Sequence, residues 1–172
     1  GIPMFTLEDV KPGDSGEGEF CFSIVDNPAY MWMCGELTEN AENGQSEPEM
    51  DVDDTPDEGE LANAMQVTVS YCTDDGEGGN VIGDEIVSGS LADVMLALQA
   101  GVPLSGDGDA DAPLADRPTF DGVTEPFLDR EPNVAEQCVC FEWVVPTSVE
   151  NEIQTDSVAF DFEFYAVQAR HN

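Results

Sequence analysis

The sequence contains very few basic residues. Its 172 residues include 4 lysines and arginines against 38 aspartates and glutamates, which gives a formal net charge of −34. This composition excludes an ordinary nucleic-acid-binding protein, because contacts with phosphates require Lys and Arg. It also disfavours docking on anionic lipid for the same reason. Hydrophobic residues still make up 41% of the chain, so a globular core is expected.

Long hydrophobic runs and catalytic motifs are missing as well. No apolar run approaches the ~18 residues that a membrane span requires. No signal peptide is recognisable in the given sequence, which begins Gly1-Ile2-Pro3-Met4-Phe5. We therefore expect no membrane span and a mature or trimmed chain. The single histidine, His171, lies beside the C-terminus, and there is no HExxH motif. We expect no catalytic residues, no enzymatic activity and one domain over residues 1–172.

The acidic residues are spread along the whole chain rather than gathered in one tail. At low ionic strength this many like charges would repel one another and destabilise the compact state. In molar salt the screening length falls to about 3 Å, and most of that repulsion disappears. The distribution therefore indicates a protein from a hypersaline environment, with solvent cations as its partners. An acidic cation-binding protein from ordinary salt is the alternative.

Five cysteines are present without any CxxC pair: Cys21, Cys34, Cys72, Cys138 and Cys140. Four of them, all except Cys34, fall on the polar faces of the strands that the sequence predicts. A structural free thiol is normally buried, so we expect these cysteines to form disulfides in an oxidising compartment. The expectation is two intrachain bridges and one remaining thiol, with the pairing left open.

Apolar and polar residues alternate with a period of two along most of the chain. In the clearest case, Val158, Phe160, Phe162 and Phe164 share one face, and Asp161 and Glu163 lie on the other. Such alternation is typical of sheets with one packed and one wet face. The sequence predicts an all-β, jelly-roll-like β-sandwich of at least six strands. These lie around residues 19–24, 30–37, 67–71, 81–87 (a hairpin turning at Gly83-Asp84), 139–145 and 158–166.

Two short helices interrupt the strands. Ser90 precedes apolar residues at helical spacing, has Asp93 three residues later, and Gly101 ends the run. The sequence thus predicts a helix between Ser90 and Gly101, and a shorter one over residues 60–65. Residues 39–59 and 104–132 are expected to be loops.

Several blocks, in order, resemble a known family. Lys11-Pro12-Gly13-Asp14 before an alternating strand is similar to the KPGD element of the TasA/camelysin family, and residues 151–168 resemble its closing strand. Residues 26–33 and 35–44, with the terminal Arg170-His171-Asn172, resemble the haloarchaeal branch, usually described as having a SipW-type signal peptide. The matches run from about residue 5 to the end of the chain.

This resemblance implies an extracellular or cell-surface protein that joins copies of itself into matrix fibres. In donor-strand complementation, the N-terminal strand of one subunit enters a groove of the next. Only ten residues precede Lys11, so the donor candidates are Ile2, Met4, Phe5 and Leu7, with Pro3 restricting them to edge-like pairing. The alternative is an ordinary first strand of the same domain.

One acidic segment has a spacing typical of calcium ligands. Asp107, Asp109 and Asp111 match the first three acidic positions of a calcium loop, although Pro118 stands where the bidentate Glu is expected. Ca²⁺ is therefore the only cofactor that the sequence suggests, and a solvated loop is the alternative.

The sequence is compatible with three functions. The first is a salt-adapted, secreted filament or biofilm-matrix subunit. The second is a monomeric acidic cell-surface module that binds divalent cations or a ligand. The third and weakest is a camelysin-like protease, which the sequence offers no clustered histidines to support.

Overall fold

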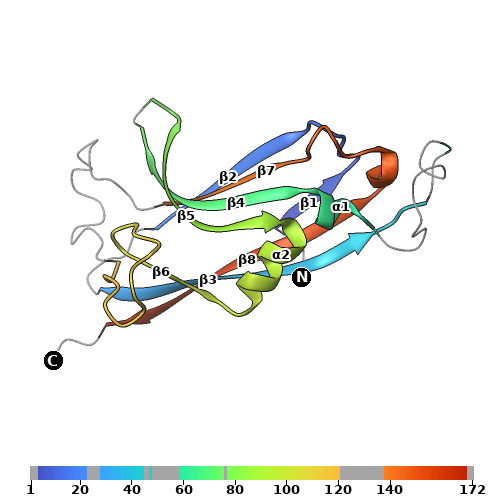
Figure 1. Cartoon of the computed structure of the whole chain (residues 1–172). Helices are drawn as coiled ribbons and strands as arrows, with labels where there is room; N and C mark the ends of the chain where they lie inside the picture. The colour runs from blue at the N-terminus through green and yellow to red at the C-terminus, as the bar shows by residue number, and fades with distance from the viewer. Residues whose placement is uncertain are drawn as a thin grey trace.

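The computed structural model of the chain describes residues 4–22, 28–44, 47, 59–75, 77–120 and 138–169. Within these residues, two four-stranded antiparallel sheets pack face to face as a β-sandwich (Figure 1). The strands are β1 (Phe5–Glu8), β2 (Ser15–Cys21), β3 (Ala29–Ala41), β4 (Gln66–Asp74), β5 (Asn80–Ser90), β6 (Val102–Leu104), β7 (Cys138–Val144) and β8 (Ser157–Gln168).

The strand order is that of a jelly roll. One sheet has the order β1-β8-β3-β6, and the other has the order β2-β7-β4-β5. The first strand thus pairs with the last and the second with the seventh, so that the chain is wound as a folded-over hairpin. This confirms the predicted all-β jelly-roll sandwich with short helices.

The alternation in β8 explains how the two sheets pack. Phe160 and Phe162 point into the sandwich and are at most 5% exposed. Glu163, the next residue after Phe162, faces solvent. Phe160 lies 5.5 Å from Phe141 of the opposite sheet, between ring centroids. Burial of these rings contributes a large part of the hydrophobic stabilisation of the core.

Both predicted helices are present. They are α1 (Leu61–Ala64) and α2 (Leu91–Gln99). A short 3₁₀ helix, η1 (Asn151–Ile153), lies between β7 and β8 and was not predicted from the sequence. The Ser90 side chain accepts a hydrogen bond from the Asp93 N–H at 3.1 Å, as expected for an N-cap. The buried face of α2 consists of Leu91, Val94, Met95 and Leu98.

The predicted hairpin at Gly83-Asp84 is wrong. Residues 80–90 form one continuous strand, β5, and its turn toward β4 lies at residues 75–79 instead. Asp75 makes that turn by accepting hydrogen bonds from the N–H groups of Glu77 and Gly79. Gly83 lies in an irregular stretch of the β4–β5 pairing, where a Cβ would come within 3.3 Å of the Tyr71 carbonyl oxygen. Its glycine therefore marks a close backbone approach and not a turn.

Two disulfides link three strands of one sheet. Cys21 of β2 is bonded to Cys138 of β7, and Cys72 of β4 is bonded to Cys140 of β7. Cys34 is a free thiol, so the expected two bridges and one remaining cysteine are found. The assumption that the bridging cysteines are exposed was wrong for three of them, because Cys72, Cys138 and Cys140 form a buried cluster.

Candidate functional site

The two strands that flank β8 in its sheet, β1 and β3, differ greatly in length. β3 pairs with β8 along its whole course, from Ala29–Gln168 to Ala41–Ser157. On the other side, β1 pairs only with residues 157–160. Among the described residues, no strand pairs with residues 161–168 on this side. We call this segment the open edge of β8.

Phenylalanines from both sheets meet beside the open edge. Phe20 of β2 lies 5.6 Å from Phe162 and 5.3 Å from Phe164, between ring centroids. Phe22, just after β2, lies 4.7 Å from Phe164. Phe20, Phe22 and Phe164 are only partly buried. The space between the two sheets is therefore lined by aromatic rings along this margin.

The predicted donor residues lie at the start of this margin. Phe5 occupies the interior of its own domain, where its ring stacks on Phe160 at 5.1 Å, and Leu7 also packs against the core. Met4 is 52% exposed. Ile2 lies outside the described residues. In a single chain, β1 is thus the first strand of its own sheet, and a role for these residues in contacts between copies stays a prediction.

An apolar patch covers the outer face of the same end of β8. Tyr165 and Val167 are exposed there, and they lie opposite Trp32 and Tyr30 of β3. The Trp32 and Tyr165 rings are 5.9 Å apart. Contiguous exposed apolar side chains are one of the surface features found at contact sites. In the sequence, only the strongly apolar stretch from Tyr30 to Met33 indicates this patch.

A buried arginine lies beneath this patch. The Arg117 guanidinium donates hydrogen bonds to the carbonyl oxygens of Met31 and Leu104, at 3.0 and 3.1 Å. It also lies 4.3 Å from the centre of the Trp32 ring, a cation–π distance. One of the four basic residues of the chain is therefore used inside the fold, where it joins β3 and β6.

The predicted calcium ligands do not converge on one point. The Asp107 carboxylate accepts hydrogen bonds from the Ser105 hydroxyl and the Asp109 N–H, and these hydrogen bonds hold its pKa below the usual range. Asp109 in turn accepts a hydrogen bond from the Asp111 N–H at 2.9 Å. In the described part of the chain, the three carboxylates do not form a group close enough for one ion. Calcium binding at this segment stays a prediction.

A different set of carboxylates does converge. One oxygen each of Glu42, Glu60 and Asp156 lie within 4.8 Å of one another. Burial raises the pKa of Asp156 to about 7, against the opposing effect of hydrogen bonds from the Leu61 and Glu60 N–H groups, and the negative charges of Glu42 and Glu60 raise it further. Sequence reasoning missed this group because Asp156 is separated from Glu42 by 114 residues.

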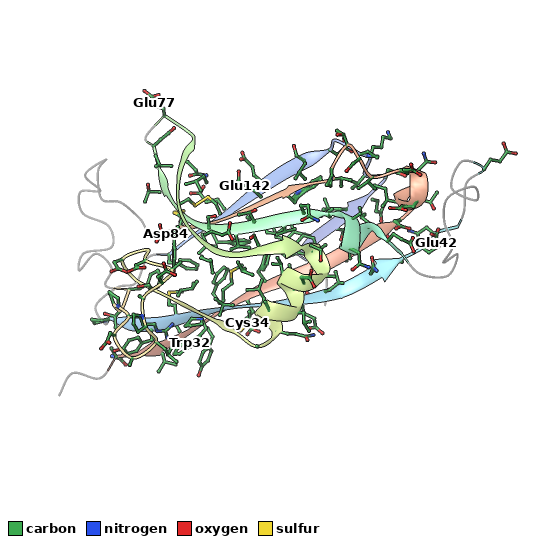
Figure 2. All side chains as sticks on the ribbon, viewed as in Figure 1. Trp32, Cys34, Glu42, Glu77, Asp84 and Glu142 are labelled. Atoms are coloured by element: carbon green, nitrogen blue, oxygen red, sulfur yellow. A yellow bond between two sulfur atoms is a disulfide. The ribbon has the colours of Figure 1, made fainter. Side chains whose placement is uncertain are left out.

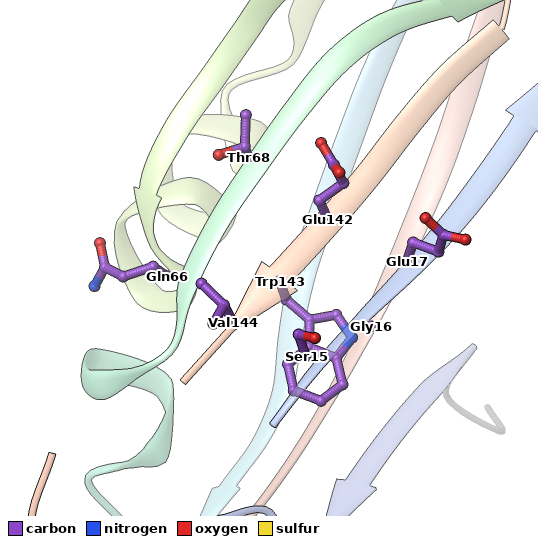
Figure 3. Close-up of a pocket in the computed structure, with 8 residues that line it drawn as sticks. All are labelled: Ser15, Gly16, Glu17, Gln66, Thr68, Glu142, Trp143 and Val144. Carbon is purple, nitrogen blue, oxygen red and sulfur yellow. The ribbon is translucent and has the colours of Figure 1, made fainter. Parts of the chain in front are cut away.

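A depression of about 560 Å³ opens on the other sheet (Figure 3). Strands β2, β7 and β4 line it, with Glu17 and Glu142 among its polar residues. The Trp143 ring lies so close to Gly16 that a Cβ there would come within 2.6 Å of its indole nitrogen. None of the residues that line the depression is a histidine, cysteine or lysine.

Comparison with protein-family models and with curated proteins finds no match to this chain. Among the described helices, none is long and apolar enough to cross a membrane.

Proposed function

We propose that this protein is a secreted subunit of an extracellular filament or biofilm matrix, which polymerises by donor-strand complementation in high salt. The family resemblance of the sequence suggests this role, and the jelly-roll fold is compatible with it. The pairing of β1 with only four residues of β8, beside the open edge, is the observation that carries the proposal. In this proposal the protein has a mechanical function, without catalysis.

A strand edge without a neighbouring strand, beside an apolar margin, is the kind of surface that accepts another strand. Exposed edges are normally short, charged or covered, because they otherwise template pairing with another chain. Here residues 161–168 offer backbone donors and acceptors, and Phe20, Phe22 and Phe164 offer partly buried rings beside them. A strand from a second copy would satisfy the backbone groups and cover the rings.

The donor segment in this proposal is β1 itself. It pairs through only four residues, Phe5–Glu8, and lies at the margin of its sheet. Release of such a short edge strand breaks few hydrogen bonds, and the same contacts can be remade on a neighbour. Insertion of one copy into the next is a head-to-tail contact that does not close on itself, so it produces a filament.

The surface chemistry favours assembly in brine and outside the cell. A net charge of −34 opposes contact between copies unless salt screens it. The patch of Tyr30, Trp32, Tyr165 and Val167 would then support lateral contacts. The two disulfides are compatible with an oxidising, extracellular compartment.

Cross-linking between copies tests strand exchange directly. Thr6 of β1 lies opposite Ala159 of β8. In a Cys34→Ser background, Thr6→Cys and Ala159→Cys are placed on separate copies, which are mixed at molar NaCl under mild oxidation. Strand exchange predicts disulfide-linked pairs of the two variants. Linkage only in the Thr6→Cys/Ala159→Cys double variant, and never between the mixed single variants, would show that β1 stays in its own domain.

Negative-stain microscopy of the unmodified protein in molar salt gives the second test. Long fibres are expected. Dispersed particles at every protein and salt concentration would instead support the alternative, a monomeric acidic surface module. The converging carboxylates of Glu42, Glu60 and Asp156 are the feature that favours that alternative.

A further inference from the structure

We propose that Glu42, Glu60 and Asp156 form a binding site for one calcium ion, at the end of the sandwich where β3 ends and β8 begins. The proposal concerns the single folded chain and does not depend on filament assembly. Figure 2 shows Glu42 at the end of the molecule opposite Trp32. The site is distinct from the segment around Asp107, which the sequence suggested.

Asp156 supplies the strongest evidence, because half of its carboxylate is unused. The side chain is fully buried, with 0% exposed. Its Oδ2 accepts hydrogen bonds from the N–H groups of Glu60 and Leu61, at 2.7 and 2.9 Å. Its Oδ1 is buried, and no group of the described residues donates a hydrogen bond to it. Capping the start of α1 therefore explains one oxygen of Asp156 but leaves the other unexplained, and a buried unpaired carboxylate oxygen is costly.

Glu42 shows the same division of its two oxygens. Its Oε1 accepts hydrogen bonds from the Gly44 N–H at 2.9 Å and from the Thr155 hydroxyl at 3.1 Å. Its Oε2 is buried and accepts no hydrogen bond from the part of the chain that the structure describes. In both residues one oxygen is thus held by protein donors, which orients the carboxylate and leaves the second oxygen for a ligand.

Charge and size select the ligand. Three carboxylates within 4.8 Å repel one another, and the charges that act on Asp156 are both negative. A cation is therefore the ligand that would stabilise the group, and oxygen ligands favour hard cations. Calcium binds oxygens at 2.3–2.6 Å, so one ion can touch oxygens up to about 5 Å apart. Magnesium requires a smaller and more regular octahedral shell, which fits ligands from three separate segments less well.

The backbone around the three acids is fixed by its own contacts. The Asn40 amide donates to the Gly59 carbonyl at 2.6 Å, and a Cβ on Gly59 would come within 3.0–3.2 Å of the Ala41 backbone. On the other side, the Asn43 amide donates to the Thr155 carbonyl and to the Ser157 hydroxyl, both at 2.9 Å. The segments that carry the acids are therefore held together before any ion binds, which lowers the entropic cost of binding.

Calorimetric titration with Ca²⁺ at molar KCl, after treatment with a chelator, tests the site. We expect saturable binding of one Ca²⁺ per chain and a higher melting temperature with Ca²⁺ than with chelator. Asp156→Asn keeps the shape of the side chain and removes its charge, so it should weaken binding by roughly tenfold or more. Glu42→Gln should act in the same direction, and it keeps the test decisive if Asp156→Asn does not fold.

Asp107→Asn is the matched control, because it removes one carboxylate from the other acidic segment. It should leave the titration unchanged. The proposal is overturned if Ca²⁺ does not bind in molar KCl, which would mean that monovalent ions or a proton suffice. It is equally overturned if Asp156→Asn and Glu42→Gln bind as well as the unmodified chain, or if Asp107→Asn alone abolishes binding.

Discussion

Glu17 and Glu142 lie directly opposite each other on the neighbouring strands β2 and β7. Both are exposed on the outer face of the sheet. Glu36 of β3 and Asp161 of β8 form a second pair of this kind on the other sheet. Like charges directly opposite each other destabilise a sheet, whereas opposite charges stabilise it. The two pairs are thus local instances of the repulsion that the total charge implies.

The Glu17–Glu142 pair predicts a salt-dependent effect of mutation. Glu142→Gln should stabilise the fold by a few tenths of a kcal/mol at low salt, because it removes the repulsion between strands. In molar NaCl the gain should vanish, since a screening length of about 3 Å is shorter than the separation of the two charges. Denaturant unfolding at low and at molar salt measures the difference.

Glu77→Gln provides the control for this experiment. Glu77 lies at the tip of the β4–β5 turn (Figure 2). Glu77→Gln therefore changes the net charge by the same amount but removes no repulsion between two glutamates on neighbouring strands. An equal gain from both variants at low salt would assign the effect to total charge. A larger gain from Glu142→Gln would assign part of it to the pair.

The two disulfides should carry much of the stability of the sheet. Cys21–Cys138 closes a separation of 117 residues and Cys72–Cys140 one of 68. Removal of Cys72–Cys140 by a double Ser substitution should cost about 2–5 kcal/mol, chiefly because the unfolded chain gains freedom. Unfolding in denaturant with and without reductant measures this cost, and Cys34→Ser should have a much smaller effect.

Peptide mapping under non-reducing conditions checks the pairing itself. Cys138 lies opposite Cys21 on one side and opposite Cys72 on the other. A link between Cys72 and Cys138 is therefore the pairing that would contradict the one described here. A bridge involving Cys34 would contradict it as well.

Arg117 should be essential for the join between β3 and β6. Arg117→Ala removes two hydrogen bonds to backbone carbonyls and the contact with Trp32, so a loss of about 2–4 kcal/mol is expected. Thermal unfolding measures the loss, and tryptophan emission should shift to the red as Trp32 becomes wetter. Lys11→Ala changes the charge equally on an exposed residue and should leave stability nearly unchanged. Equal losses from both variants would show that only the positive charge matters.

The fold class could be predicted because periodicity reports which face of a strand is buried. The alternation in Val158–Phe164 identified β8 and its inner face correctly. Short edge strands carry too few residues for such a pattern, so β6 was not predicted, and β1 was expected as a strand only from the family resemblance. Gly83-Asp84 was taken for a turn because glycine marks both turns and close backbone approaches, and only pairing with β4 distinguishes the two.

The sites depend on contacts that one sequence does not reveal. Asp156 meets Glu42 only after the chain has wound through both sheets, and neither residue belongs to a metal-binding motif. The disulfide pairing was equally hidden, because it depends on the register of three strands. By contrast, the acidic spacing at Asp107–Asp111 is visible in the sequence, yet hydrogen bonds within the turn use those carboxylates.

Residues 157–160 of β8, which β1 covers, should accept β1 as a separate peptide. A variant that begins at Asp9 lacks β1 and exposes the core ring of Phe160, against which Phe5 stacks. It should be less stable than the full chain, and a peptide of residues 1–10 should bind it and restore the melting temperature. A peptide carrying Phe5→Ala and Leu7→Ala has the same backbone and should fail, because it lacks the side chains that enter the core. Equal rescue by both peptides would show that backbone pairing alone holds the strand, and no rescue by either would remove the physical basis for strand exchange.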